Sequence, residues 1–211
     1  MPLRPFVRAV PWIVAAALVL SSVLPLALAN AGVEQAPRVK GSVERGNTVC
    51  GSDLDTGVPG LGIDLCHYDF YVEPARDGDP DHAYTVDWIQ FALEPQSGYC
   101  VADAQGSIGV QDASIIASAP SRRSRSGRNT VELRLASPDR TLGSLRQRFR
   151  IARGTTSTDP RRSPTGDRLH WRWRGRSRDP IHLVVGVAFA HPITEPRPPT
   201  DLDFRLTSTP C

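Results

Sequence analysis

The chain has 211 residues, 40% of them hydrophobic and 22% charged, and no apolar run beyond residues 12–28 is long enough to span a membrane. This excludes a membrane protein with several spans. The net charge of +3 conceals a division along the sequence, because residues 30–119 hold 4 Lys or Arg and 14 Asp or Glu, whereas residues 120–180 hold 17 Arg and 5 Asp or Glu. One-signed segments favour encounters with charged macromolecules but say little about fold.

The first 31 residues have the features of a secretory signal peptide. Arg4 and Arg8 form a basic start, an apolar stretch follows, and small residues precede two equally suitable cleavage points, after Ala29 or after Ala31. The alternative is an uncleaved signal anchor, since 17 apolar residues approach the lower limit of a membrane span. We expect residues 1–29 to be removed as a signal peptide, which makes the protein secreted and free of the membrane.

Four cysteines remain after cleavage, which predicts two disulfides in an oxidising compartment. Three connectivities are possible. We favour Cys50–Cys211, which would tie the two ends together, with Cys66–Cys100 inside that loop. No Cys-x-x-Cys pair is present, which argues against a structural zinc site or a thioredoxin-type redox site.

The mature chain of about 180 residues has a length typical of a single domain. Residues 30–62 lack periodicity and predict an irregular lead-in to a domain over residues 63–211. From there on, apolar and polar residues alternate with the period of two that is typical of β-strands. The apolar positions of these predicted strands are, in chain order, Cys66 to Val72, Tyr84 to Leu93, Val131 to Leu135, Leu169 to Trp173 and Leu202 to Leu206.

Residues 181–190 are nearly all apolar and rich in β-branched side chains, which predicts a central strand covered on both faces. Two segments, 120–128 and 154–167, are rich in Ser, Arg, Gly and Thr and are expected to be loops. The 19 prolines and the lack of a 3.6-residue period argue against long helices. The sequence therefore predicts an all-β protein, an antiparallel β-sandwich of about eight or nine strands linked by disulfides.

Catalytic motifs are missing from the sequence. His67 and Asp69 are two residues apart on a predicted strand and so share a face, where they resemble an oriented base, but no nucleophile elbow or phosphate loop accompanies them. The run from Asp77 to Asp81 resembles the start of a calcium loop but has His82 at the sixth position and Trp88 at the twelfth. We expect no enzyme activity, no metal and no cofactor.

The arginine-rich segment offers a second kind of site. Its arginines predict a surface for heparin-like polyanions, which the alternating arginines from Arg172 to Arg178 would extend. The export signal argues against nucleic acid as a partner. Trp171 and Trp173 share a strand face and are interpreted as core residues beneath charged neighbours, in preference to a stacking platform for sugar. The polyanion-binding candidates are Arg122, Arg123, Arg125 and Arg128.

Five short motifs of the sequence are notable in combination: Gly62-Ile63-Asp64, Gly78-Asp79-Pro80, Tyr84-Thr85-Val86, Gly127-Arg128-Asn129-Thr130-Val131 and Leu133-Arg134-Leu135. Together they resemble a known family, the secreted chemokine- and cytokine-binding β-sandwich proteins of poxviruses (the poxvirus immune-evasion domain family). The likeness covers roughly residues 50–140, and the arginine-rich composition is similar to that of the parapoxvirus members. This chain departs from the family in having fewer cysteines, a shorter length and a brief acidic loop.

The resemblance implies a secreted decoy that sequesters a host chemokine or cytokine through a sheet face and an acidic loop. The arginine-rich segment makes glycosaminoglycan a further candidate partner. Basic chemokines would be steered by the acidic segment, while aromatic anchors would slow dissociation. The alternatives are an exported bacterial β-sandwich that binds surface glycan or polyanion through its arginine-rich half, and a hydrolase that uses His67 and Asp69. The electrostatic contacts that the resemblance implies are Glu73, Asp77, Asp79 and Asp81. Tyr84 and Trp88 are interpreted either as the aromatic anchors of such a decoy or as core residues.

Overall fold

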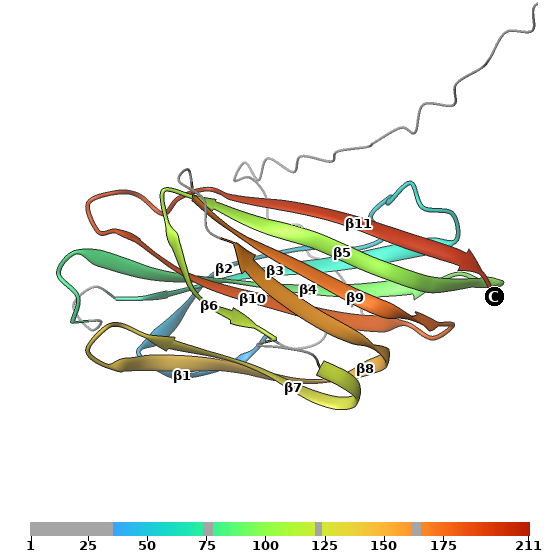
Figure 1. Cartoon of the computed structure of the whole chain (residues 1–211), viewed down its shortest axis with the longest axis horizontal. Helices are drawn as coiled ribbons and strands as arrows, with labels where there is room; N and C mark the ends of the chain where they lie inside the picture. The colour runs from blue at the N-terminus through green and yellow to red at the C-terminus, as the bar shows by residue number, and fades with distance from the viewer. Residues whose placement is uncertain (1–35, 74–77, 121–123, 162–165) are drawn as a thin grey trace, which may run out of the picture.

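Eleven antiparallel strands make up the part of the chain that the structure, a computed structural model, describes: residues 36–73, 78–120, 124–161 and 166–211 (Figure 1). Side chains of residues 124–129 and 149–153 are not described. No helix in these residues is long and apolar enough to cross a membrane. The strands are β1 (Arg38–Gly41), β2 (Val43–Gly51), β3 (Leu61–Val72), β4 (His82–Pro95), β5 (Tyr99–Gln111), β6 (Ser114–Ala119), β7 (Ser124–Ala136), β8 (Thr141–Arg161), β9 (Gly166–Ser177), β10 (Ile181–Pro192) and β11 (Thr200–Pro210).

The strands form two sheets, which confirms the predicted all-β antiparallel sandwich. One sheet, called here the inner sheet, has the order β2-β3-β4-β10-β6. The other, called the wrapping sheet, has the order β1-β8-β9-β5-β11, with β7 also paired to β8. The 21-residue strand β8 joins two parts of the wrapping sheet, because its residues 143–146 pair with β1, its residues 141–156 pair with β7 and its last eight residues pair with β9.

The wrapping sheet covers both faces of the inner sheet. On one face, side chains of β3, β4 and β10 pack against β7 and β8, and on the other face they pack against β5, β9 and β11. Strand β4 is accordingly buried at every position from Tyr84 to Leu93, and β10 is buried from Leu183 to Phe189. The prediction that residues 181–190 form a central strand covered on both faces is confirmed.

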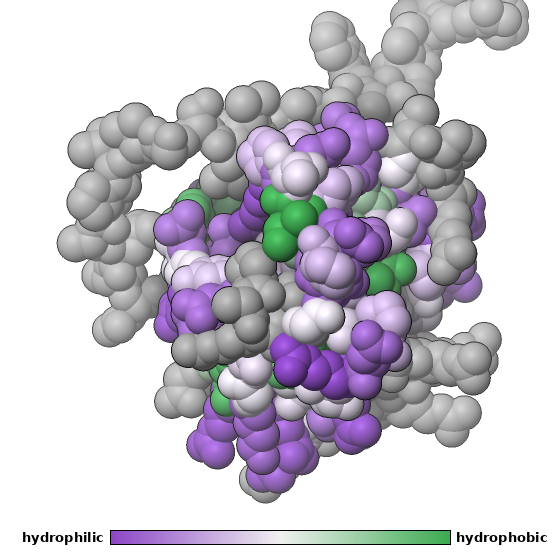
Figure 2. Space-filling model, turned by 90° about the vertical axis from the view of Figure 1, so that its left-hand side faces the viewer, coloured by the Kyte–Doolittle hydropathy of each residue, from purple (hydrophilic) through white to green (hydrophobic). Residues whose placement is uncertain are grey.

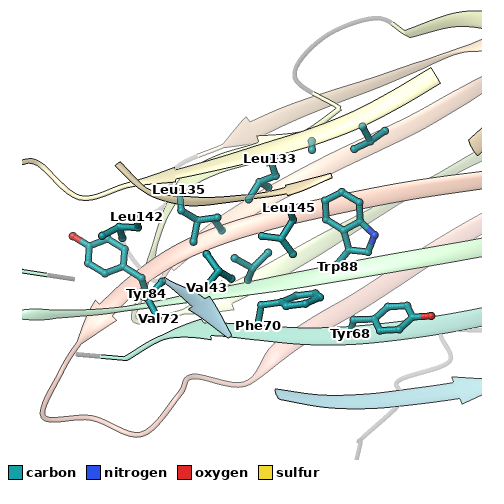
Figure 3. Close-up of a cluster of buried hydrophobic side chains, with 14 of the residues drawn as sticks. Val43, Tyr68, Phe70, Val72, Tyr84, Trp88, Leu133, Leu135, Leu142 and Leu145 are labelled. Atoms are coloured by element: carbon teal, nitrogen blue, oxygen red, sulfur yellow. The ribbon is translucent and has the colours of Figure 1, made fainter. Parts of the chain in front are cut away.

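The first core cluster holds the largest buried side chain of β4 (Figure 3). Trp88 is 0% exposed and lies among Phe70, Leu133 and Leu145 in the close-up. Its indole nitrogen donates a 2.8 Å hydrogen bond to the side-chain oxygen of Gln147, so the one polar atom of the ring is satisfied inside the core.

The second core cluster contains Trp171 and Trp173, which are 2% and 0% exposed. Trp171 packs on Phe91 of the inner sheet, with ring centroids 5.0 Å apart. The prediction that these tryptophans are core residues under a charged outer face is confirmed. Their intervening and flanking residues, His170 and Arg172, lie on the outer face of the wrapping sheet among the residues that line a groove there.

The disulfides join Cys50 to Cys66 and Cys100 to Cys211, so both predicted pairings were wrong. Cys50 and Cys66 are directly opposite in the β2–β3 ladder, with Cα atoms 4.1 Å apart. Strand β11 pairs with β5 as far as Pro210, which places the last residue of the chain beside the start of β5. The register of the paired strands, rather than closure of the two chain ends, therefore decides which cysteines form each disulfide.

Two further expectations differ from the structure. The stretch 30–62, predicted to be an irregular lead-in, contains β1 and β2 over residues 38–51, where only Val43 is fully buried. Both predicted loops are largely strand as well, since β7 begins at Ser124 and β8 continues to Arg161. These polar residues are extended because their backbones hydrogen-bond to neighbouring strands. Their sequences lack the alternation of apolar and polar residues by which a strand is recognised.

Candidate functional site

The acidic hairpin between β3 and β4 is organised by Asp79. Its carboxylate accepts a 2.6 Å hydrogen bond from the Tyr84 hydroxyl and further bonds from the backbone amides of Asp81 and His82. These bonds, that from Tyr84 above all, lower the pKa of Asp79 to about 2. Asp79 therefore holds the turn together, while Asp81 is exposed and Glu73 half-buried.

The predicted aromatic anchors are not on this surface. Tyr84 and Trp88 are 3% and 0% exposed and both belong to the first core cluster, so neither is available to a ligand (Figure 3). Alternation explains this outcome, because both point to the face of β4 that β7 and β8 cover. Asp77, the remaining predicted contact, lies outside the described residues.

An exposed aromatic does lie near the hairpin, and sequence reasoning missed it. Tyr71 of β3 is 41% exposed, and its hydroxyl donates a 3.3 Å hydrogen bond to Glu44 of β2. The charge of Glu44 raises the pKa of Tyr71, with smaller contributions from burial and from Glu73. Figure 2, a view of one end of the molecule, shows hydrophobic residues as separate small patches among hydrophilic ones.

The arginine-rich segment does not form an isolated basic surface where its side chains are described. Arg172 makes a two-point ion pair with Asp103, at 3.0 and 2.7 Å, and Arg168 contacts Asp201 at 3.3 Å. Strand β9 pairs with β5 from the acidic part of the sequence, so charges that are separated along the chain lie side by side in the sheet. Of the predicted polyanion contacts, Arg122 and Arg123 lie outside the described residues, and only the backbones of Arg125 and Arg128 are described.

A groove of about 390 Å³ crosses the outer face of the wrapping sheet. Its walls come from β8, β9, β5 and β11, whose alternate residues point outward while their neighbours fill the second core cluster. The volume lies within the range usual for small-molecule sites. The residues that line the groove are Gln105, Gly106, Ser107, Ser157, Asp159, Arg161, His170, Trp171, Arg172, Asp203 and Arg205.

The groove contains polar groups that are not used within the protein. Among the described residues, the side chains of Gln105, His170, Asp203 and Arg205 have no hydrogen-bond or ion-pair partner. The neighbouring side chain of Arg172 is held in place by its ion pair with Asp103. Three arginines (Arg161, Arg172 and Arg205) and two aspartates (Asp159 and Asp203) line the groove, and Asp103 beside it pairs with Arg172. The groove therefore offers donors and acceptors together, with charges of both signs.

A second polar cluster is mostly buried on the inner sheet. His67 and Asp69 share a face of β3, as predicted, and the structure adds Asp87 of β4 and Arg197 from the β10–β11 connection. Burial lowers the pKa of His67, but the hydrogen bond and charge of Asp87 and the charge of Asp69 outweigh it and raise that pKa above 6.5. Sequence reasoning missed Asp87, although a carboxylate among the mostly apolar residues of β4 was the signal for it.

Comparisons with known proteins add no assignment: no protein-family model matches the chain, and no curated protein matches it.

Proposed function

We propose that this chain is an exported glycan-binding protein whose binding site is the groove on the outer face of the wrapping sheet. The signal-like first 31 residues and the two disulfides support export, because disulfides persist in oxidising compartments. The observation that carries the proposal is the set of unpartnered polar side chains in that groove: Gln105, His170, Asp203 and Arg205.

The chemistry of these side chains favours a sugar. Each hydroxyl of a sugar donates and accepts hydrogen bonds, and the groove supplies both acceptors, such as Asp203, and donors, such as Arg205. The mixed charges make a neutral or weakly charged glycan a better ligand than a polyanion. The site stands on strands of a sheet and so needs little ordering when a ligand binds. The proposed activity is binding without catalysis.

The test is capture on a panel of immobilised neutral and acidic glycans, followed by calorimetry with the best ligand. A hydrogen bond to a charged group contributes about 1.5–3 kcal/mol. We therefore expect Asp203→Asn and Arg205→Gln each to weaken binding roughly 10- to 100-fold. Arg174→Gln is the matched control, since Arg174 is an exposed arginine of β9 that does not line the groove. Binding that survives both groove variants, or no capture of any glycan, would contradict the proposal.

A second candidate function is the decoy that the family resemblance implies, and the exposed Tyr71 favours it. Tyr71 with Glu44 and the partly exposed Glu73 makes a small acidic surface that bears an aromatic side chain, as capture of a basic chemokine or cytokine requires. In this proposal Tyr71 takes the anchoring role that the sequence had assigned to Tyr84 and Trp88.

Surface plasmon resonance against a chemokine and cytokine panel, at two salt concentrations and with heparin as a control surface, tests the decoy. Association that slows as salt rises, together with at least tenfold faster dissociation in Tyr71→Ala, is the expected result. Silence on every surface of the panel would exclude this candidate and leave the glycan proposal untouched. Binding to heparin alone would instead indicate that the arginine-rich segment is a polyanion-binding site.

A further inference from the structure

Two neighbouring strands of the inner sheet place an imidazole and two carboxylates at one point. Asp69 of β3 and Asp87 of β4 are directly opposite in the strand register, and His67 lies two residues before Asp69 on the same face. Each of the three residues offers a ligand atom, and these atoms all lie within 4.8 Å of one another. Because the three groups stand on paired strands, their positions are fixed by the sheet rather than by a loop.

The spacing of the donor atoms is that of a metal coordination shell. The Nε2 atom of His67 lies 2.9 Å from one oxygen of Asp87 and 3.2 Å from one oxygen of Asp69. With bonds of about 2.0–2.1 Å from zinc to nitrogen and oxygen, the edges of a tetrahedron measure about 3.3 Å. Little movement would therefore bring all three atoms to one ion.

A second observation concerns the hydrogen bonding of the two carboxylates. Asp87 is 0% exposed, yet its Oδ2 atom is buried without a hydrogen-bond partner, and the Oδ1 atom of Asp69 is buried without one as well. A buried carboxylate oxygen without a donor is unfavourable, because it has lost its hydration and gained no hydrogen bond in exchange. Arg197, distant in sequence, contacts only the other oxygen of each carboxylate, and the Oδ1 atom of Asp69 is the oxygen that lies 3.2 Å from Nε2 of His67.

We propose that His67, Asp69 and Asp87 bind one divalent transition-metal ion, with Arg197 as the group that holds the carboxylates in place. The ion takes the imidazole Nε2, the Oδ1 atom of Asp69 and one oxygen of Asp87, and the neutral ring then carries its proton on Nδ1. Arg197 keeps its contact with the Oδ2 atom of Asp69, at 2.6 Å, and its contact with Asp87. Such outer contacts orient the ligands of many metal sites.

The donor set selects the class of metal. An imidazole with two carboxylates suits zinc, manganese or iron, whereas calcium takes six to eight oxygen ligands. With a neutral imidazole the two carboxylates and the one guanidinium leave a net charge of −1, which favours a cation. The side chains of His67 and Asp69 are 15% and 17% exposed, so an ion can enter from solvent and a water can complete the shell.

Zinc titration of the chelator-treated full-length chain tests the site, with a chromophoric chelator as competitor. We expect one zinc ion per chain, and at least tenfold weaker binding in His67→Gln and in Asp69→Asn. The control is His182→Gln, because His182 is a partly buried histidine of β10 that does not belong to the cluster. A rise in Tm with zinc should accompany binding in the wild type and the control only.

Cobalt absorption of the unaltered wild type provides a second measurement that does not depend on how the variants fold. Visible bands of a four- or five-coordinate cobalt ion, removed by zinc, are the expected result. The absence of bound metal in the wild type would overturn the proposal, as would zinc binding that is equally tight in His67→Gln and in the control. Neither outcome bears on glycan binding, since the groove shares no residue with the metal cluster.

Discussion

Removal of the two disulfides should cost different amounts of stability, and the structure sets the order. Cys100–Cys211 spans 111 residues of sequence, whereas Cys50–Cys66 spans 16. In the chain-entropy model, closure of these loops restricts the unfolded state by about 4.8 and about 3 kcal/mol. For a chain of this size the losses correspond to a fall in Tm of roughly 10–19 °C and roughly 6–12 °C.

The comparison uses paired Cys→Ala variants, one pair for each disulfide, with urea unfolding at constant pH. Cys66 and Cys100 are both 3% exposed, so the buried half of each disulfide leaves a similar cavity and the difference reports mainly on loop length. We expect the Cys100/Cys211 variant to be less stable than the Cys50/Cys66 variant by roughly 1.7 kcal/mol. An equal or reversed order would refute the loop-length reasoning. Non-reducing peptide mapping that joins Cys50 to any residue other than Cys66 would refute the connectivity.

Three further changes test the core and the hairpin. Gly186→Ala places a methyl group 2.8 Å from the ring of buried Trp88 and should cost about 1–3 kcal/mol in urea unfolding, so an unchanged midpoint would contradict this packing. Gln147→Leu removes the acceptor of the Trp88 indole and should cost about 1–3 kcal/mol, with the change in tryptophan fluorescence as a local readout. Asp79 has a pKa lowered from 3.8 to about 2, chiefly by the Tyr84 hydroxyl, so its ionised form stabilises the fold. That contribution is complete above the unfolded-state pKa and is lost as pH falls through about 2, and Asp79→Asn should therefore flatten the acid limb of a Tm-against-pH curve between pH 4 and 2. An acid limb identical to that of the wild type would contradict it.

Local alternation was a reliable guide wherever one face of a strand packs on a core. Residues 131–135 and 169–173 alternate strictly, and both lie in strands with their apolar side chains buried. The same alternation correctly placed His67 and Asp69 on one face. It failed for residues 38–51, because β1 and β2 bury few side chains and are held mainly by backbone bonds to β8 and β3.

The candidate sites were less predictable, because each combines strands from distant parts of the chain. The metal cluster joins His67 to Asp87 on the next strand and to Arg197 at a separation of more than a hundred residues. The groove brings Gln105 beside His170 and Arg205 because β5 lies between β9 and β11. Periodicity reports which way a side chain points, but it carries no information about which strand lies next to it.

The sequence by itself determined the class of this protein: an antiparallel all-β chain with two disulfides, apolar strand faces and charged outer faces, since these follow from the period of two and from composition. The tertiary structure alone decided which strands are neighbours, and with that the cysteine pairs and the pairing of acidic with basic segments. It also decided the burial of Tyr84 and Trp88. The physical reason is that strand order and register are set by covering both faces of the inner sheet at once, a condition on the whole chain that no short window of residues contains.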